Sequence, residues 1–121
     1  MEQKKQISYR FGLWGEDLAC LYFRLKGYRI LARNHRTRYG EIDIIAQRRK
    51  TLVFIEVKSR KTMYQALYAL SPFQQKRITN AAKSFLSVNP RYCGQEIRFD
   101  FLAITHGYWP RHIKNAWFDE T

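Results

Sequence analysis

A chain of 121 residues can build one hydrophobic core but not two, so we expect a single domain over residues 1–121. Apolar residues make up 45% of the chain and aromatic residues 16%, which excludes an intrinsically disordered protein. Lysine and arginine total 22 against 10 acidic residues, a net charge of +12. This excess favours a polyanionic partner such as nucleic acid, although an ordinary solvated basic surface is the alternative.

The sequence favours a cytoplasmic location without a membrane partner. Its apolar runs fall short of the ~20 residues that a transmembrane helix needs. The basic stretch over residues 1–10 lacks the apolar core of a signal peptide, and we expect a flexible N-terminal segment there. Cys20 and Cys93 lack metal-ligand spacing, so they are predicted to be free thiols in a reducing compartment.

The first predicted element is a helix over residues 11–26, because apolar residues recur along one face at helical spacing. Gly27 is a natural stop for this helix. A short strand is expected over residues 28–32, followed by a basic loop over residues 33–40. The apolar face of the helix consists of Trp14, Leu18, Leu21, Tyr22 and Leu25.

Two β-rich runs, residues 41–46 and 51–58, have the spacing of a β-hairpin. A second helix is predicted over residues 72–88, since Ser71 can cap it and Pro72 suits its first position. Its buried stripe is predicted to contain Ile78, Ala81, Ala82, Phe85 and Leu86.

Two more strands are predicted, over residues 96–104 and 112–118. Residues 59–70 could extend the hairpin or form a mobile loop. The resulting order, α-β-β-β-α-β-β, indicates an α/β domain with a central mixed sheet flanked by helices.

Acidic residues interrupt the apolar runs of the hairpin. Asp43 lies among isoleucines, and Glu56 follows three apolar residues. An unpaired buried carboxylate is costly, and such breaks in the apolar pattern tend to occur at functional sites. If the connecting loop has an even number of residues, Glu41 pairs with Glu56 and Asp43 with Phe54, and all the charged side chains including Lys58 share one face. An odd loop would separate them.

On one face, Asp43 and Glu56 would be diagonal neighbours, and their carboxylates would repel each other unless a cation lay between them. Such oxygen ligands suit Mg²⁺ or Mn²⁺. Lys58 could orient an attacking water or stabilise transition-state charge. Alternatively, Glu56 and Lys58 form an exposed ion pair. The embedded Asp43 favours a metal-dependent phosphodiesterase.

These residues resemble the PD-(D/E)XK nuclease superfamily, whose restriction-endonuclease-like fold holds an Asp and a Glu-x-Lys motif on adjacent strands. The closer resemblance is to the small bacterial YraN family of predicted endonucleases, which is similar also to archaeal Holliday junction resolvases. It covers nearly the whole chain, through Gly15–Glu16, Leu25–Leu31, Asn34–Arg36, Gly40–Ala46, Val53–Arg60, Gln75 with Arg77 and Ile78, Arg98–Asp100 and Ile113–Ala116.

The resemblance implies that Asp43 and Glu56 are metal ligands for Mg²⁺ or Mn²⁺ and that Lys58 is the catalytic lysine. Glu16 matches an extra helical acid of resolvase-like members, or it simply complements the helix dipole. Gln75 matches a glutamine of the second helix, or it is an ordinary polar residue on the helix surface.

The sequence leaves open the role of Glu41 and one cation position, at Gln74. Glu41 supports the site from outside, or it is a solvated residue at the start of a strand. Gln74 stands where the family usually has a lysine, which removes one expected cation.

Basic residues flank the predicted site and are expected to contact phosphates. Tyr39, Tyr64 and Tyr68 could stack on unpaired bases, or each could pack within the protein. Asp100 is expected to pair with a nearby arginine. The predicted phosphate contacts are Arg36, Arg38, Arg60, Lys61, Lys76 and Arg77.

The sequence therefore predicts a Mg²⁺-dependent endonuclease that acts on DNA rather than RNA, with branched or structured DNA among its candidate substrates. The alternatives are a non-catalytic nucleic-acid-binding module on the same fold, an RNA-processing nuclease, and a structural adaptor. Junction cutting would favour a homodimer, by analogy, because two scissile strands need two sites.

Overall fold

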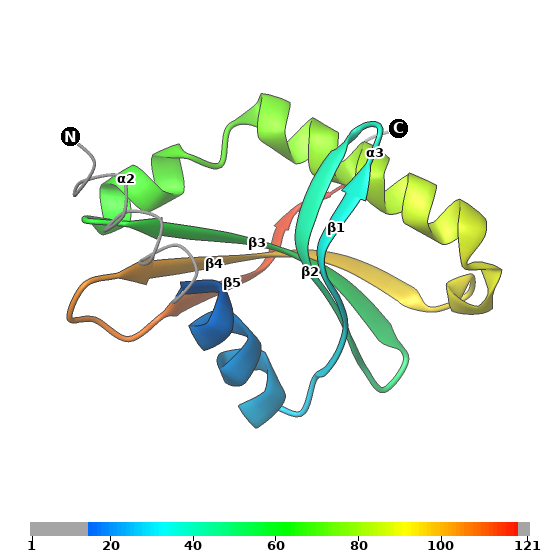
Figure 1. Cartoon of the computed structure of the whole chain (residues 1–121), viewed down its shortest axis with the longest axis horizontal. Helices are drawn as coiled ribbons and strands as arrows, with labels where there is room; N and C mark the ends of the chain where they lie inside the picture. The colour runs from blue at the N-terminus through cyan, green and yellow to red at the C-terminus, as the bar shows by residue number, and fades with distance from the viewer. Residues whose placement is uncertain (1–14, 119–121) are drawn as a thin grey trace.

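In residues 15–118, which the computed structural model describes, one mixed β-sheet of five strands runs in the order β1 to β5 (Figure 1). β3 and β4 are parallel and the other neighbours are antiparallel. The chain must therefore cross over the sheet between β3 and β4. The strands are β1 (Arg29–Thr37), β2 (Gly40–Arg48), β3 (Thr51–Arg60), β4 (Glu96–Thr105) and β5 (Arg111–Trp117).

Helices cover both faces of this sheet (Figure 1). The chain is helical over residues 15–25 on one face, whereas α2 (Met63–Tyr68) and α3 (Pro72–Val88) lie on the other. The predicted α/β class and element order are confirmed, with α2 as an additional short helix. Within the described range, no helix is long and apolar enough to cross a membrane. Residues 1–10 and Trp14 lie outside the described residues.

Helix α3 begins and ends where the sequence predicts. The Ser71 hydroxyl accepts a hydrogen bond from the backbone N–H of Gln74 at 3.1 Å, and Pro72 occupies the first turn. The predicted stripe faces the sheet. Its buried members are Ile78, Ala81, Ala82 and Phe85.

The first helix packs through a face rotated from the predicted one: Tyr22 is buried and Leu18 packs against the core as predicted, whereas two other predicted residues face solvent. Leu21 and Leu25 are 51% and 76% exposed. Small residues set the rotation of the helix, because a side chain at Gly15 would collide with Ser59 on β3. The helix therefore approaches the sheet along its glycine and alanine side. Its buried residues are Ala19, Cys20, Tyr22 and Phe23.

Strand β1 is longer than the strand predicted over residues 28–32. It continues to Thr37 and pairs with β2, so the predicted basic loop that starts at Arg33 is mostly strand. Charged side chains are tolerated there because β1 is an edge strand, and they hide the alternation that marks a buried strand. The register shifts between Ile30 and Ala32.

Strands β2 and β3 form the predicted hairpin. A two-residue turn, Arg49–Lys50, joins them, and Arg49 has a φ of 55°. Positive φ at this position is typical of tight hairpin turns. The loop has an even number of residues, which confirms the condition for placing the charged side chains on one face.

The predicted partners across the hairpin are wrong. Phe54 pairs with Ile45 rather than with Asp43. The partner of Phe54 thus lies two residues further along β2 than predicted. The same shift in register means that Glu41 does not pair with Glu56. The reason is that β2 extends two residues beyond its predicted end, so the ladder runs right up to the turn.

Candidate active site

The β3 residues Glu56 and Lys58 lie on the sheet face that α2 and α3 cover. They share this face with Phe54, which belongs to the apolar core under α3. Their neighbours on β4 are Phe101 and Ala103, which pack in the apolar cluster under α2. A strand in the middle of the sheet thus carries a carboxylate into the interior, where Glu56 is only 2% exposed.

The two oxygens of the Glu56 carboxylate have different surroundings. Oε1 lies 2.8 Å from the Lys58 ammonium and accepts a long hydrogen bond of 3.5 Å from the Gln74 side chain. Oε2 is buried and has no hydrogen-bond partner among the described residues. Leaving such an oxygen unsatisfied is costly, and in native proteins it commonly marks the place of a water or an ion.

Asp43 lies next to this pair, at the point where β2 and β3 part. Strand pairing ends at Ile44 and Ile55. Beyond it, Asp43 Oδ2 accepts a hydrogen bond from the backbone N–H of Val57 at 2.9 Å. The side chain of Asp43 therefore continues the contact between the strands and turns its carboxylate toward β3.

Burial, together with the negative charge of Glu56, raises the pKa of Asp43 to about 8. The Val57 N–H and the Lys58 ammonium act in the opposite direction but do not outweigh these effects. Two carboxylates therefore meet in a partly dry site that holds too little positive charge for both.

The donor set fits a hard divalent cation. Asp43 and Glu56 offer carboxylate oxygens, and one of these oxygens lacks any partner in the described part of the chain. Residues 15–118 contain no cluster of three or more histidine, cysteine or acidic side chains placed to hold a metal. A pair of carboxylates suits Mg²⁺, which usually keeps several waters and completes its coordination with substrate phosphates.

Glu16 lies at the periphery of the site. Its Oε2 accepts a hydrogen bond from the Asn34 side chain at 3.2 Å and lies 3.9 Å from the Arg33 guanidinium. The charge of Glu16 still contributes to the raised pKa of Asp43, as the smallest of the effects. Glu16 is therefore close enough to influence the site, while its own carboxylate is already paired.

On α3, the residue that contacts the site is Gln74. Gln75, which the sequence singles out, donates instead to the backbone carbonyl of Leu70 at 3.4 Å. A signal for Gln74 was present: it lies four residues before Ile78, so it extends the buried stripe of α3 by one turn. Glu41 is 41% exposed and lies 3.7 Å from the Arg36 guanidinium.

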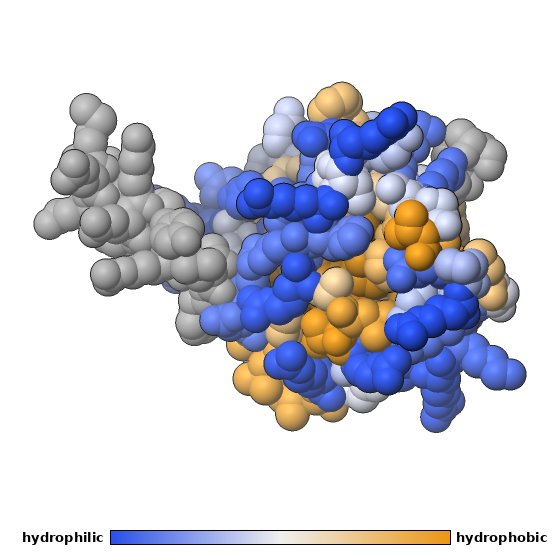
Figure 2. All heavy atoms as spheres, turned by 45° about the vertical axis from the view of Figure 1, so that its right-hand side comes forward, coloured by the Kyte–Doolittle hydropathy of each residue, from blue (hydrophilic) through white to orange (hydrophobic). Residues whose placement is uncertain are grey.

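The predicted phosphate contacts are all on the surface. Arg36, Arg38, Arg60, Lys61, Lys76 and Arg77 are exposed. Two of them frame the turn between β1 and β2, where Arg38 stacks over the Tyr39 ring and Arg77 donates to the Tyr39 carbonyl at 3.3 Å. Figure 2 shows one face of the molecule, on which hydrophilic side chains surround a smaller apolar area.

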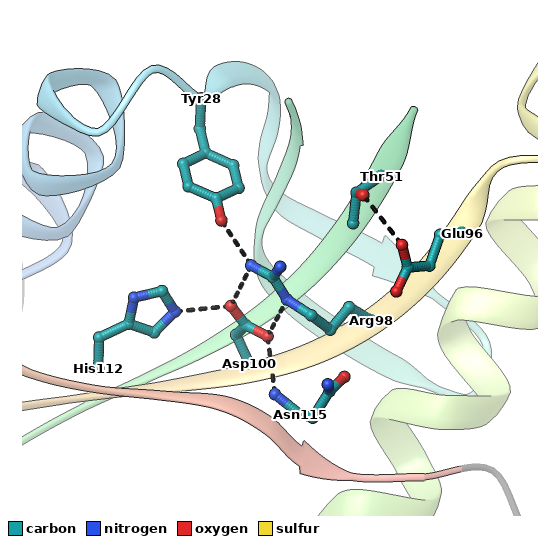
Figure 3. Close-up of polar contacts among 7 residues, drawn as sticks. All are labelled: Tyr28, Thr51, Glu96, Arg98, Asp100, His112 and Asn115. Atoms are coloured by element: carbon teal, nitrogen blue, oxygen red, sulfur yellow. Dashed lines mark hydrogen bonds and ion pairs between the residues drawn. The ribbon is translucent and has the colours of Figure 1, made fainter. Parts of the chain in front are cut away.

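A second buried acid, Asp100, provides a comparison within the described residues. It is 0% exposed. Arg98 binds both of its oxygens at 2.8 Å, His112 Nε2 lies 2.6 Å away, and the Asn115 N–H donates at 3.2 Å (Figure 3). Arg98 also donates to the Tyr28 hydroxyl. The predicted pairing of Asp100 with a nearby arginine is confirmed.

The two buried acids, Asp100 and Glu56, differ in how completely their carboxylates are paired. Burial alone would raise the pKa of Asp100, but hydrogen bonds from His112 and Arg98 outweigh it and hold that pKa below its usual value. Asp100 is thus fully paired, as expected of a structural acid. Glu56 retains an unpartnered oxygen beside a second carboxylate, as expected of a binding site.

Comparison with known proteins finds one matching family. The model of the uncharacterised protein family UPF0102 matches residues 15–104. A UPF0102 protein of Mesorhizobium japonicum is 46% identical over 114 residues, covering 94% of this chain and 91% of the relative. One from Rhodopseudomonas palustris strain BisA53 is 48% identical over 106 residues, with 88% and 82% coverage. One from Nitrobacter winogradskyi is 47% identical over 109 residues, with 90% and 92% coverage. The chain belongs to the UPF0102 family.

Proposed function

We propose that this member of UPF0102 is a metal-dependent endonuclease that hydrolyses phosphodiester bonds in DNA. The observation that carries the proposal is the buried carboxylate of Glu56, whose Oε1 is paired with Lys58 and whose Oε2 has no hydrogen-bond partner in residues 15–118. The neighbouring Asp43, with its raised pKa, adds a second carboxylate in need of a positive charge. In a site with only a structural role, a buried carboxylate oxygen without a partner would lower the stability of the fold and bring no functional benefit.

Asp43 and Glu56 are the residues that would hold the cation. A bound Mg²⁺ or Mn²⁺ would act as a Lewis acid on a phosphate oxygen and would make water a better nucleophile at neutral pH. The two carboxylates would hold this positive charge where the pairing of β2 with β3 ends. The hydrogen bond from Gln74 to Glu56 helps to hold the glutamate in place, so Gln74 is a positioning residue.

Lys58 is the group that would act on the reacting phosphate. Its side chain is 21% exposed, whereas that of its partner Glu56 is 3% exposed, so the ammonium lies between the buried carboxylate and the surface. From there it can donate to a water or to the phosphoryl oxygens that gain negative charge in the transition state. The ion pair with Glu56 keeps the flexible lysine side chain oriented for this role.

Nucleic acid is the proposed substrate because of the positive charge, and DNA is preferred over RNA because of the resemblance to nucleases of the restriction-endonuclease-like fold. The net charge is +12, and the six basic residues predicted to contact phosphates are all exposed. Cations on a surface bind nucleic acid through release of the counterions that surround the phosphates. The same charge also favours the alternative of a binding module without catalysis, which predicts salt-sensitive DNA binding that does not depend on divalent ions.

The test is a cleavage assay with the full chain. Branched, flapped, single-stranded and duplex DNA are incubated with Mg²⁺, with Mn²⁺ or with EDTA, using wild type, Glu56→Gln and, as a charge-matched control, Asp17→Asn. We expect cleavage that requires the divalent ion, is lost in Glu56→Gln and persists in Asp17→Asn. Absence of cleavage on every substrate, or full activity of Glu56→Gln, would contradict the proposal. A parallel arm with RNA tests the preference for DNA.

A further inference from the structure

Helix α2 is built onto the part of the sheet that carries Glu56 and Lys58. The helix begins three residues after the end of β3 at Arg60. Its buried residue, Ala66, packs with Phe101 and Ala103 of β4. Because these two β4 residues are the register partners of Glu56 and Lys58, α2 covers the strand directly beside the proposed catalytic pair.

The outer side of α2 presents two parallel aromatic rings. Tyr64 and Tyr68 are 77% and 79% exposed. Their ring centroids are 6.1 Å apart and the ring planes differ by 19°. Residues four apart lie on the same face of a helix, so the backbone itself holds the rings in register. Neither ring contributes to the core, and because the two rings stack on each other, a ligand can contact the outward-facing surfaces of the pair.

The same end of the sheet carries more exposed aromatic and basic side chains. Arg60 is the last residue of β3, Lys61 follows it before α2 begins, and both are exposed. Arg60 pairs in the sheet with Thr105, the last residue of β4. The turn that follows β4 carries Tyr108 and Trp109, which are 76% and 79% exposed, and it lies at the same side of the molecule as α2 (Figure 1).

We propose that Tyr64 and Tyr68 form a stacking surface for unpaired DNA bases, and that the substrates of the site therefore contain a single-stranded segment. This inference rests on the proposed function. Alternation of cations with flat aromatic rings is how proteins bind single strands: the cations neutralise the phosphates and the rings stack on the bases. In a duplex the base faces are covered by their neighbours, so a paired helix gains little from these tyrosines.

Binding measured without metal separates this inference from catalysis. Fluorescence anisotropy in EDTA compares a labelled oligo(dT) strand of about 20 nucleotides, longer than one domain's site, with a blunt duplex of the same length. For Tyr64→Ala/Tyr68→Ala we expect single-strand binding to weaken by about tenfold or more, with duplex binding changed less than about twofold. Tyr64→Phe/Tyr68→Phe keeps the rings and should bind like wild type.

Phe118→Ala is the matched control. Its ring is 72% exposed but follows Trp117, which pairs with Phe99 near the start of β4, far along the strand from Thr105. This variant should bind both DNAs like wild type. The inference would be overturned if the double alanine variant bound the single strand as tightly as wild type does. It would also be overturned if the variant lost affinity equally for the single strand and the duplex.

The two proposals can fail separately. Tyrosine-dependent binding of single strands by a protein that cleaves no DNA would support the stacking surface and contradict the nuclease. Cleavage that requires Glu56 but is unaffected in the double alanine variant on flapped and single-stranded DNA would support the nuclease and overturn the stacking surface. Circular dichroism of each variant checks that the fold is intact, and the phenylalanine variant supplies the comparison if alanine disturbs α2.

Discussion

Lys58 and Glu56 form a close ion pair in which only one carboxylate oxygen takes part. Nζ lies 2.8 Å from Oε1, while Oε2 is buried without a hydrogen-bond partner among the described residues. The lysine thus neutralises the glutamate in part and leaves Oε2 without a partner in the described part of the chain. The two members of the pair should therefore differ in what they contribute to metal binding and to catalysis.

Lys58→Met should abolish most of the catalysis but not the binding of metal. Without the ammonium, charge that develops on the phosphoryl group is unopposed from this side, and cleavage should slow by about 10²–10³-fold. Single-turnover kinetics at saturating Mg²⁺ measure this loss. Lys50→Met, which removes the same charge from the turn between β2 and β3, should cleave like wild type. An equal loss in both variants would mean that only net charge matters.

Asp43→Asn should change how the stability of the metal-free protein depends on pH. In the folded protein the pKa of Asp43 is about 8, against an ordinary value of 3.8. The folded state therefore binds an extra proton between these values, so this group's contribution to stability is greatest below pH 4 and is lost as the pH rises toward 8. The limiting slope is about 1.4 kcal/mol per pH unit.

The asparagine variant cannot titrate and should show a flatter curve over the same range. Urea unfolding of both proteins in EDTA from pH 5 to pH 8.5 measures the difference. We expect Asp43→Asn to gain stability relative to wild type as the pH rises. A constant difference between the two proteins across that range would show that Asp43 is ionised throughout.

Divalent ions should stabilise the fold through Asp43 and Glu56. A ligand that binds only the folded state at ten times its Kd contributes about 1.4 kcal/mol. Thermal unfolding with and without Mg²⁺ should therefore show a higher Tm for wild type and a much smaller shift for Glu56→Gln. Asp17→Asn serves as the control, since the side chain of this acid is 70% exposed and pairs with Arg33 rather than with Lys58. A shift of the same size in all three proteins would place the ion elsewhere.

Asp100→Asn should weaken the fold without changing the site. Asp100 is buried between Arg98 and His112, and its loss would leave the Arg98 charge unpaired, at a cost of about 3 kcal/mol. Because the pKa of Asp100 lies below its usual value, its contribution is present at neutral pH and is lost as the pH falls. Urea unfolding at pH 7 measures the loss.

The control for this variant is again Asp17→Asn, which should cost less than about 1 kcal/mol. At temperatures at which Asp100→Asn is still folded, its metal-dependent cleavage should remain near that of wild type. Loss of cleavage in the folded variant would mean that the Asp100 cluster takes part in the site, against the structural role assigned to it.

Local patterns in the sequence were sufficient to predict the hairpin and α3. Alternation along a strand and the capping pair Ser71–Pro72 are properties of a few adjacent residues, so Asp43 and Glu56 stood out against their apolar neighbours before the fold was known. The order of elements followed from the same local signals. The functional assignment still depends on the geometry of the contacts between strands.

What could not be predicted depends on contacts between elements. The rotation of the first helix follows from the close approach of Gly15 to Ser59, so Leu21 and Leu25 are exposed despite their spacing. The hairpin register depends on how far the ladder extends toward the turn. Gln74, by contrast, was within reach of the sequence, because it lies four residues before Ile78 on the same face of α3.

The most direct test of the account is the position of a divalent cation. Crystals of the full chain grown with Mn²⁺ should show an anomalous peak between the carboxylates of Asp43 and Glu56, with Glu56 Oε2 among the ligands and metal–oxygen distances of about 2.0–2.2 Å. The peak should be absent in Glu56→Gln. A manganese peak elsewhere, or none at saturating Mn²⁺ with Oε2 hydrogen-bonded to protein or water, would contradict the assignment of this site.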